Sequence, residues 1–480
     1  MSVFYRMPNL GTALGTLLAC VLATIAGPHA HADPASSRDS GNNAPADPLT
    51  TPDAGGWLRT YTPDGRIDTD NPFFQDLGSN GRTCNICHRQ AEGWTVSAAE
   101  VRARFDATDG TDPIFRPVDG ANSPLADVST IDARRRAYSM LLNRGVIRIG
   151  LPIPANAEFT LTAVDDPYGF ASASELSLFR RPLPTTNLGF LSVVMWDGRE
   201  TAAPFLPPMD AGVNDADLRA SLSSQAIDAT LGHAQAAAPP TSEQVDQIVR
   251  FERSLATAQI RDNGAGWLNA DDALGGPRML VNLRFWVGIN DTLGADPVDM
   301  PFDPKAMRLF DGWSSAGALT ANPARRAILR GQALFNSLPI RITGVGGLND
   351  TLGLPEIDGT CTTCHDTPNI GDHSVGLPLD IGTADASRRT PDMPLYTLTN
   401  NATGESVQTT DPGLALISGR WTDIGKFKGP ELRALVARPP YFHNGSAATL
   451  LDVIDFYDTR FNMGLSGPQK SDLVAFLSAL

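Results

Sequence analysis

Two copies of a Cys-x-x-Cys-His motif constrain this chain more than any other feature of its sequence. The first copy comprises Cys84, Cys87 and His88, and the second comprises Cys361, Cys364 and His365. In c-type haem attachment both thiols add to the haem vinyl groups, and the adjacent imidazole becomes the proximal iron ligand. Each residue of the motif then has its own task. The sequence therefore predicts two covalently bound c-type haems, with the histidine of each motif as an iron ligand.

Disulfides and zinc are the alternative uses of these cysteines. The chain has five cysteines, and Cys20 is the only one outside the two motifs. Four cysteines in an exported protein could pair as disulfides, and they could also hold zinc. Neither alternative explains why a histidine follows each Cys-x-x-Cys pair directly. Haem is therefore the favoured interpretation.

The first 32 residues have the layout of a secretory signal peptide. A single positive charge, Arg6, precedes an apolar run over residues 10–26, and a small-residue exit ends at Ala32. We expect cleavage after Ala32 and export to the periplasm. An uncleaved membrane anchor and a lipoprotein processed at Cys20 are the alternatives. The Gly and Thr interruptions favour cleavage, and the apolar run continues past Cys20, where a lipoprotein would turn polar.

The charge excludes nucleic acid as a partner. The formal net charge is −15, and loss of Arg6 with the signal peptide would make it −16. An acidic surface repels nucleic acid, whereas it speeds encounters with basic soluble proteins.

Composition divides the rest of the chain into three parts. Residues 33–56 contain almost no large apolar side chain, which predicts a disordered linker, with folded structure from Trp57 onward. We assign residues 57–320 to an N-terminal haem domain with an insertion. Residues 321–480 are assigned to a complete C-terminal cytochrome c domain. This length is enough for about two or three domains.

Helix signals frame the C-terminal domain most clearly. Residues 324–335 have a helical composition, with apolar residues spaced on one face. Ser466 and Gln469 read as a capping box at the start of a final helix. We expect the first and last helices of the domain to cross closely at Gly331.

The expected fold class is mainly α, with two cytochrome c-like haem domains and long loops. Thr241 and Gln244 read as a second capping box, which predicts a helix that starts there. The remainder of residues 89–320 is rich in Pro, Gly and Asp and has only short apolar runs. This pattern predicts helix and loop with few strands.

Five segments form a recognisable series along the chain. They are Phe73-Phe74 with the first Cys-x-x-Cys-His motif, Arg181-Pro182-Leu183-Pro184-Thr185, Trp196-Asp197-Gly198-Arg199, Phe251-Glu252-Arg253-Ser254-Leu255, and Pro440-Tyr441-Phe442-His443-Asn444-Gly445-Ser446. The series and its order resemble the bacterial di-haem cytochrome c peroxidase family. A set of separate motifs in one order is more specific than any one of them.

The resemblance implies a division of labour between the two haems. The N-terminal haem, with His88 as its proximal ligand, would bind and cleave hydrogen peroxide. The C-terminal haem, with His365, would be a six-coordinate, high-potential site at which electrons enter the protein. The electron donor would be a small soluble protein, either a cytochrome c or a cupredoxin. A homodimer is one possible assembly.

Three more residues receive roles from the same resemblance. Met463 stands where the family has its axial Met, and a thioether ligand raises the potential of haem iron. His373 is the rival ligand. Trp196 would lie between the haems and shorten the electron path, while His443 would hydrogen-bond a propionate or the backbone near the C-terminal haem. The alternative for Met463 and Trp196 is ordinary packing in the core.

The chain departs from the family around the N-terminal haem. No histidine occurs from residue 89 to residue 232, where many members have a distal ligand, and the region 89–180 is unusually long. Peroxide cleavage needs a group that moves a proton between the two oxygens. His233 is either that distal catalytic residue or an exposed histidine at the end of a helix. Four acids in the same stretch are further candidates: Glu200, Asp210, Asp215 and Asp217.

Calcium is a doubtful additional cofactor. The family often binds this ion between its haems with an Asn ligand, and Pro182 stands at the matching position.

The leading functional hypothesis is a peroxidase that reduces hydrogen peroxide to water. A di-haem oxidase or oxygenase acting on another substrate is the alternative enzyme, because the region 89–180 could build a different pocket. A non-enzymatic electron-transfer cytochrome, with two six-coordinate haems, is the third hypothesis.

Overall fold

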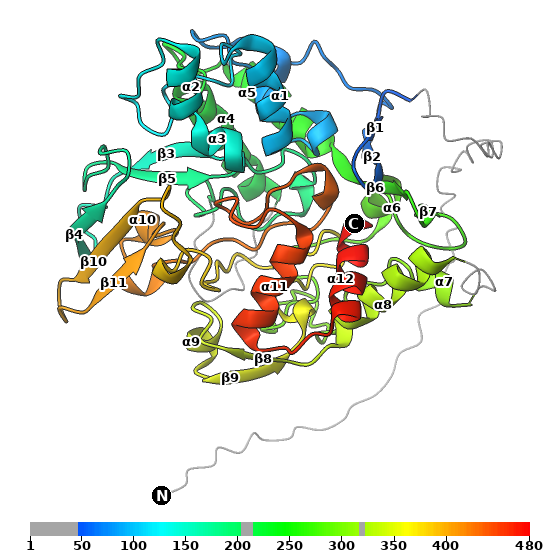
Figure 1. Cartoon of the computed structure of the whole chain (residues 1–480). Coiled ribbons are helices and arrows are strands. Elements are labelled where there is room, and N and C mark those ends of the chain that lie inside the picture. Colours follow the sequence, from blue (N-terminus) through cyan, green and yellow to red (C-terminus); the bar gives the residue numbers. More distant parts are fainter. Residues whose placement is uncertain (1–46, 203–214, 316–321) are drawn as a thin grey trace, which may run out of the picture. The chain divides into compact units, whose positions relative to one another are not determined.

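Four antiparallel sheets, rather than helices alone, organise the chain (Figure 1). The computed structural model describes residues 47–202, 215–315 and 322–480. The expected signal peptide, residues 33–46 of the expected linker and Asp210 lie outside the described residues. The structure is 33% helical and 16% strand. The prediction of a mainly α fold was therefore wrong.

The strands are short and come from the whole length of the described chain. Their bounds are β1 Thr50–Pro52, β2 Gly56–Tyr61, β3 Ile147–Leu151, β4 Phe159–Asp165, β5 Leu176–Arg180, β6 Ala256–Asp262, β7 Gly266–Trp267, β8 Ile340–Thr343, β9 Glu356–Gly359, β10 Leu395–Asn400 and β11 Ser406–Thr409. They pair in the orders β1-β2-β6-β7, β11-β10-β4, β3-β5 and β8-β9.

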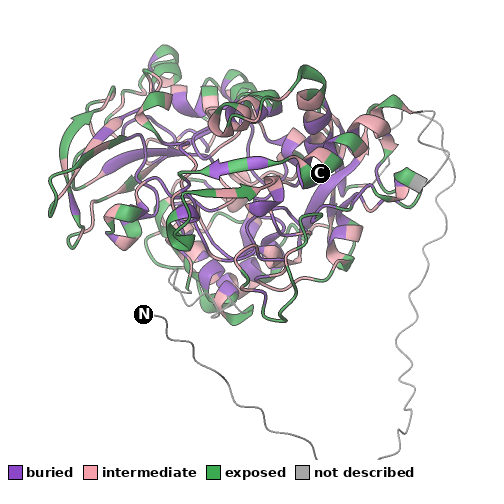
Figure 2. Cartoon of the chain, turned by 90° about the horizontal axis from the view of Figure 1, so that it is seen from below, coloured by how far each residue is buried: buried purple, intermediate pink, exposed green. Residues whose placement is uncertain are grey.

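The helices lie around these sheets (Figure 1). Their bounds are α1 Ala98–Thr108, α2 Ile131–Ala137, α3 Ser139–Arg144, α4 Asp215–Gly232, α5 Ser242–Ser254, α6 Pro277–Asn282, α7 Gly312–Ser315, α8 Pro323–Ser337, α9 Asn349–Leu352, α10 Ala415–Ser418, α11 Leu450–Phe461 and α12 Gly467–Ser478. Short 3-10 helices begin both haem motifs, over Cys84–Ile86 and Cys361–Thr363. In Figure 2 the buried residues gather inside this arrangement, and the exposed residues follow its outer surface.

Long-range pairing explains why the strands were missed. β4 lies in the region expected to be helix and loop, yet it pairs antiparallel with β10, for example Phe159 with Asn400. β2 pairs with β6 in the same way, so that Tyr61 lies opposite Ala256. Local periodicity cannot report a partner so distant in the sequence, and strand preference depends strongly on the neighbouring strand.

Ordered structure begins earlier than predicted. The sequence predicted folded structure from Trp57 onward, but β1 already begins at Thr50. β1 pairs with β2, with Thr50 opposite Arg59, and the Asp53 carboxylate accepts hydrogen bonds from the backbone of Gly55 and Gly56. The C-terminal end of the expected linker is therefore part of a sheet. The described residues from 47 onward form one compact unit, and the division at residues 320 and 321 stays a prediction.

Three predicted helix signals are confirmed. The helix expected over 324–335 is α8, and the helix expected from Thr241 is α5, with the complete capping box to Gln244. The capping box from Ser466 to Gln469 begins α12. Within the described ranges, no helix is both long and apolar enough to cross a membrane.

Gly331 confirms the close crossing of α8 and α12. A Cβ atom at this position would lie 2.0 Å from the carbonyl oxygen of Asp472 and 2.6 Å from Cβ of Phe476. Both atoms belong to α12, so the two backbones approach more closely than any side chain would allow. Leu473, Phe476 and Ile328 form a buried cluster around this crossing.

We predict that Gly331→Ala lowers the free energy of unfolding by about 1–3 kcal/mol, because the new methyl group forces the two helices apart. Denaturant unfolding of the variant and the parent measures the difference. Gly467→Ala is the matched control, since a Cβ there has no atom within 4 Å. Equal stability of Gly331→Ala and the parent would show that the helices can separate without cost.

Candidate functional site

The first Cys-x-x-Cys-His motif forms one wall of a cavity. Cys84, Cys87 and His88 all line it. His88 Nδ1 lies 3.1 Å from the carbonyl oxygen of Trp94, and a carbonyl can only accept a hydrogen bond. Nδ1 is therefore the protonated nitrogen, and Nε2 carries the lone pair that can bind a metal. Burial lowers the pKa of His88 to about 4, which keeps the ring neutral and able to act as a ligand.

An aromatic cluster holds this motif in place. The rings of Phe73, Trp94 and Phe251 meet at centroid distances of 5.1 to 6.1 Å, and the Phe73 ring lies 6.4 Å from His88. Cys84 packs against the cluster. Phe73 and Phe251 belong to two of the segments that carried the family resemblance, so these segments meet at the first motif.

His233 lines the same cavity as His88. It follows the last residue of α4, and its Nδ1 hydrogen-bonds at 2.5 Å to a carboxylate oxygen of Asp119. The other oxygen of Asp119 binds Arg82 in a buried ion pair. A carboxylate at Nδ1 fixes the orientation and the tautomer of the ring. His233 is thus a positioned cavity residue, and only 37% of its side chain is exposed.

Three of the four acids proposed as alternatives to His233 do not line the cavity, and the fourth, Asp210, lies outside the described residues. Glu200, Asp215 and Asp217 are absent from its lining. Asp215 instead forms ion pairs with Arg219 and Arg253 at the start of α4. Burial raises the pKa of Glu200, which lies near Ser224.

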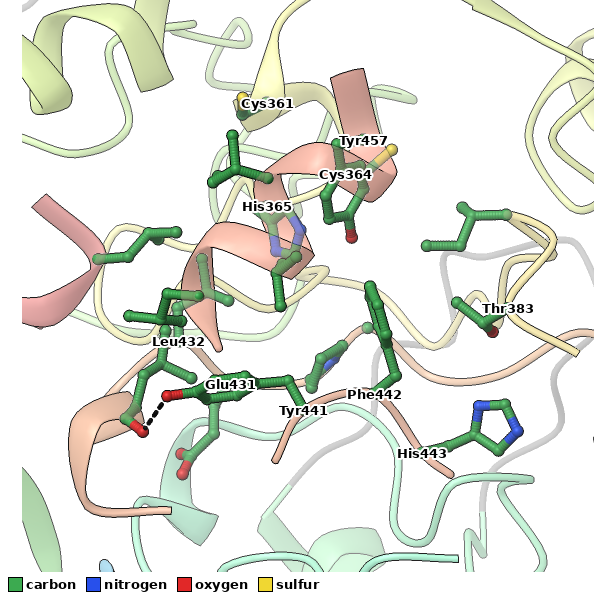
Figure 3. Close-up of a pocket in the computed structure, with 18 of the residues that line it drawn as sticks. Cys361, Cys364, His365, Thr383, Glu431, Leu432, Tyr441, Phe442, His443 and Tyr457 are labelled. Carbon is green, nitrogen blue, oxygen red and sulfur yellow. Dashed lines mark hydrogen bonds between the residues drawn. The ribbon is translucent and has the colours of Figure 1, made fainter. Parts of the chain in front are cut away.

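The second motif lines another cavity, shown in Figure 3. His365 Nδ1 lies 2.6 Å from the carbonyl oxygen of Gly371, which again leaves Nε2 with the lone pair. Burial lowers the pKa of His365 and raises the pKa of both thiols, Cys361 and Cys364, to about 12. The cavity is mostly apolar and has a volume of about 200 Å³. This exceeds the roughly 150 Å³ that suffices for a benzene-sized ligand.

Met463 lines the cavity of His365, whereas His373 does not. Met463 follows α11, and its backbone N–H donates to the carbonyl oxygen of Asp458 at 3.0 Å. His373 is buried away from the cavity and bonds through Nδ1 to Asp366. The structure thus brings together His365 and the Met expected as its partner, and it leaves out the rival.

His443 lines the second cavity on the side away from the motif (Figure 3). Its ring stacks on Phe427 at 4.0 Å and meets Trp196 edge-on at 6.3 Å. Its Nε2 is buried and has no hydrogen-bond partner. Burial lowers the pKa of His443 to about 4. The ring is therefore neutral, with a polar nitrogen available to a group that enters the cavity.

The two cavities share one wall. Nine residues line both of them: Arg181, Pro182, Leu183, Pro184, Trp196, Lys428, Pro430, Glu431 and Arg438. Trp196 is fixed there because its indole N–H donates to the carbonyl oxygen of Arg181 at 2.8 Å. Its own carbonyl accepts from the backbone of Lys428 at 2.9 Å. Trp196 thus lines both cavities, and its expected place between two haems stays a prediction.

The shared wall carries more positive than negative charge. Arg181, Lys428 and Arg438 are buried, and Glu431 is the one acid among the nine residues. Burial lowers the pKa of Arg181 to about 9, because the guanidinium meets backbone carbonyls rather than a carboxylate. Arg438 forms an ion pair with Glu431 at 3.8 Å, whereas Arg181 forms no ion pair in the described chain, and a buried cation without a paired anion is costly. An anionic group between the cavities would offset that cost.

Sequence reasoning missed Arg82, Asp119, Glu252 and the charged residues of the shared wall. Glu252 lines the first cavity, and burial alone raises its pKa to about 8. Asp119 has no local signal, because its partner His233 lies 114 residues away in the sequence. Lys428, Glu431 and Arg438 stand in a stretch between Phe427 and Pro440 that resembles a surface loop in composition.

The four cysteines of the described chain are free thiols. In residues 47–202, 215–315 and 322–480, they also belong to no group of three or more metal-ligating side chains. The disulfide and zinc alternatives therefore find no support. The calcium site stays doubtful, since Pro182 offers no side-chain oxygen and its carbonyl accepts from Oγ1 of Thr95 at 2.6 Å.

Curated relatives of this chain are named cytochrome-c peroxidase. Cytochrome-c peroxidase IdrP2 of Denitromonas iodatirespirans is 36% identical over 132 residues, which are 25% of this chain and 36% of the relative. IdrP1 of the same organism is 32% identical and covers 49% of this chain and 56% of the relative. IdrP1 of Pseudomonas sp. (strain SCT) is 28% identical, with coverages of 42% and 50%. The alignments thus cover about half of the length of each IdrP1 relative and 36% of the IdrP2 relative.

The resemblance to the bacterial di-haem cytochrome c peroxidase family is confirmed by these relatives. No family model matches the chain. Among solved structures, this chain is similar to a MauG-like protein associated with microbial copper homeostasis, with a TM-score of 0.39 and 15% sequence identity. The match covers 91% of this chain and 94% of that chain.

We predict that Asp119→Ala lowers the free energy of unfolding by about 3–5 kcal/mol, because it leaves Arg82 charged and buried without its anion. Asp106→Ala is the matched control. It breaks an exposed ion pair with Arg135 in the same region and should cost less than about 1 kcal/mol. Denaturant unfolding of both variants gives the comparison. Equal losses would mean that the Arg82–Asp119 pair is no more important than a surface ion pair.

Proposed function

We propose that this chain is a di-haem c-type cytochrome that reduces hydrogen peroxide to water. The observation that carries the proposal is a pair of adjacent apolar cavities, each lined by a Cys-x-x-Cys-His motif, that share one wall. In the reaction one H₂O₂ takes up two electrons and two protons, and two molecules of water form. The electrons come from a small cytochrome c or cupredoxin.

The residues present fit two covalently bound haems. In each cavity two free thiols stand beside an imidazole whose Nδ1 is held by a backbone carbonyl. His88 and His365 would be the proximal ligands, and Met463 would complete the second site with a thioether. Bound haem would supply an iron centre that takes up electrons and cleaves the peroxide O–O bond. Arg181, Lys428 and Arg438 are suited to the propionates, with His443 as a further hydrogen-bond partner.

His233 is the proposed acid–base residue. It lines the first cavity, and the Asp119 carboxylate orients its ring. Its Nε2 can accept the proton of a bound peroxide and return it to the departing oxygen. No other histidine of the described chain lines this cavity apart from His88.

Trp196 is the proposed electron path through the shared wall. It contacts both cavities, and two main-chain hydrogen bonds hold it. An indole in this position would divide the electron path between the two haems into two shorter steps.

Location and partners follow from the sequence. The chain would act in the periplasm after removal of residues 1–32, and its net charge of about −16 suits a basic donor protein. An oxidase or oxygenase on the same scaffold and an electron-transfer cytochrome are the alternatives, and the first cavity discriminates between them. A carrier has no use for an acid–base residue there, whereas an enzyme does.

The first functional prediction concerns haem and turnover together. Intact mass and pyridine haemochrome analysis should show two covalent haems per chain. The purified protein should then oxidise ferrocytochrome c when hydrogen peroxide is added. Replacing both thiols of one motif by Ala should remove one haem from the mass. A haem-free polypeptide would overturn the cofactor assignment, and two haems without peroxide turnover would favour the alternatives.

The second prediction concerns Trp196. Trp196→Phe should slow peroxide-dependent oxidation of ferrocytochrome c several-fold, because the indole leaves the wall between the cavities. Haem content and the spectra of both sites should stay as in the parent. Trp267→Phe, an exposed tryptophan remote from both cavities, is the control. Parent-like rates in Trp196→Phe would assign Trp196 to packing alone.

The third prediction is that the first haem site is open in the oxidised protein. Electron paramagnetic resonance should show a high-spin ferric signal that peroxide removes without prior reduction. His233→Ala should keep this signal and lose about 10²–10⁴-fold in turnover, the usual range for an acid–base group. Two low-spin signals in the parent, one of them lost in His233→Ala, would instead identify His233 as an iron ligand.

A further inference from the structure

A group of three metal-ligating side chains lies outside both cavities. Asp291, Asp366 and His373 each offer a ligand atom, and these atoms all lie within 4.8 Å of one another. Asp291 and Asp366 are 1% and 0% exposed, and His373 is 3% exposed. None of the three lines either cavity, whereas Pro182, the expected calcium position, lines both. The group is therefore separate from the haem sites and from the calcium site of the family.

The group contains buried polar atoms without partners. Oδ1 of Asp291 and Nε2 of His373 are both buried and form no hydrogen bond. Other polar atoms of the group have hydrogen-bond partners. His373 Nδ1 bonds to Asp366 Oδ2 at 3.0 Å, and Asp366 Oδ1 accepts from the backbone of Ser374 at 2.7 Å. Leaving a buried charged oxygen without a partner costs several kilocalories per mole in general. Such atoms in a native structure call for a ligand.

The charges point to a cation. Two carboxylates face one imidazole, and in the described part of the chain the only ion pair that involves any of the three joins His373 to Asp366. Even if His373 were protonated, the Asp291 carboxylate would have no cation of its own: its Oδ2 accepts from the backbone of Leu293 and Ala295, and its Oδ1 has no partner. A divalent ion balances both carboxylates and leaves the imidazole neutral.

We propose that Asp291, Asp366 and His373 bind a divalent transition-metal ion, with zinc as the reference ion. An imidazole nitrogen favours zinc and its neighbours in the series over calcium and magnesium, which prefer oxygen ligands alone. Zinc bonds to nitrogen and oxygen are about 2.0–2.2 Å long. The three atoms lie within 4.8 Å of one another, so the side chains must move inward to reach such an ion, and the His373 Nδ1–Asp366 hydrogen bond is lost if Nδ1 becomes the ligand.

The ion would fasten the segment that carries the second haem motif. Asp366 follows His365 directly, and its carbonyl accepts from the side chain of Asn290 at 3.1 Å. Thr292, in the same loop, donates to the carbonyl oxygen of Thr363 within the motif at 2.8 Å. Asp291 stands between these two residues. The metal would thus link the 290–292 loop to the haem attachment segment, which is a structural role.

Elemental analysis of the purified holoprotein tests this site independently of the haems. Zinc, manganese, calcium and iron are counted per polypeptide after gel filtration, with and without prior incubation in zinc chloride. We expect one zinc or another divalent transition ion per chain. Asp291→Asn should lose it, and Asp299→Asn, which removes an exposed carboxylate from the same region, should keep it.

Thermal unfolding gives a second measurement in case Asp291→Asn folds poorly. A chelator that leaves haem in place should lower the midpoint of the parent, and added zinc should restore it. Asp299→Asn should respond like the parent. A parent that holds no divalent transition ion before or after zinc incubation would overturn the proposal. So would occupancy by calcium alone, or equal zinc content in Asp291→Asn. None of these outcomes bears on the number of haems or on peroxide turnover.

Discussion

The arrangement of both cavities depends on a buried ion network at the end of β5. The Arg180 guanidinium bonds to Asp197 and to Asp411, and all three side chains are nearly inaccessible. Arg180 directly precedes Arg181, and Asp197 directly follows Trp196, so the network fixes two residues of the shared wall at once. Removing one member of such a buried pair costs about 3–5 kcal/mol, because the remaining charge stays desolvated. The proximity of the two cavities is thus set by electrostatics rather than by apolar packing alone.

Four of the five histidines of the described chain differ in the partner of one ring nitrogen. A backbone carbonyl holds Nδ1 of His88 and of His365, and a carboxylate holds Nδ1 of His233 and of His373. A carbonyl fixes the tautomer and leaves the ring neutral, which suits a permanent iron ligand. A carboxylate at Nδ1 orients the ring and leaves Nε2 as the free nitrogen, which fits the acid–base role proposed for His233 and the metal-ligand role proposed for His373. The hydrogen-bond partner of Nδ1 therefore determines which chemistry each histidine is suited to.

The motifs and the helix signals are both local; the structure confirms the helix signals, whereas the haem roles of the motif residues stay predictions. Two thiols and an imidazole within five residues, or a capping box such as Thr241 with Gln244, need no information from elsewhere in the chain. The pairing of the strands could not be predicted in this way. β4 has the alternating pattern of a strand at its Phe-Thr-Leu-Thr start, but its partner lies more than two hundred residues away, where no local pattern identifies it. The role of Asp119 could not be predicted for the same reason, because it depends on contacts with His233 and Arg82 that form only in the folded chain.

The long region 89–180 connects the two halves of the protein instead of extending from one of them. It supplies Asp119, Ile147, Ile149 and Arg180 to the lining of the first cavity. It also supplies β4 to the sheet that β10 and β11 build from the C-terminal half. A segment that is tied at both ends in this way cannot move without disturbing both the His233 support and the distant sheet. The region is therefore suited to act as a fixed cavity wall, and a gate that opens the first site by a large movement of this segment would have to break the β4–β10 pairing first.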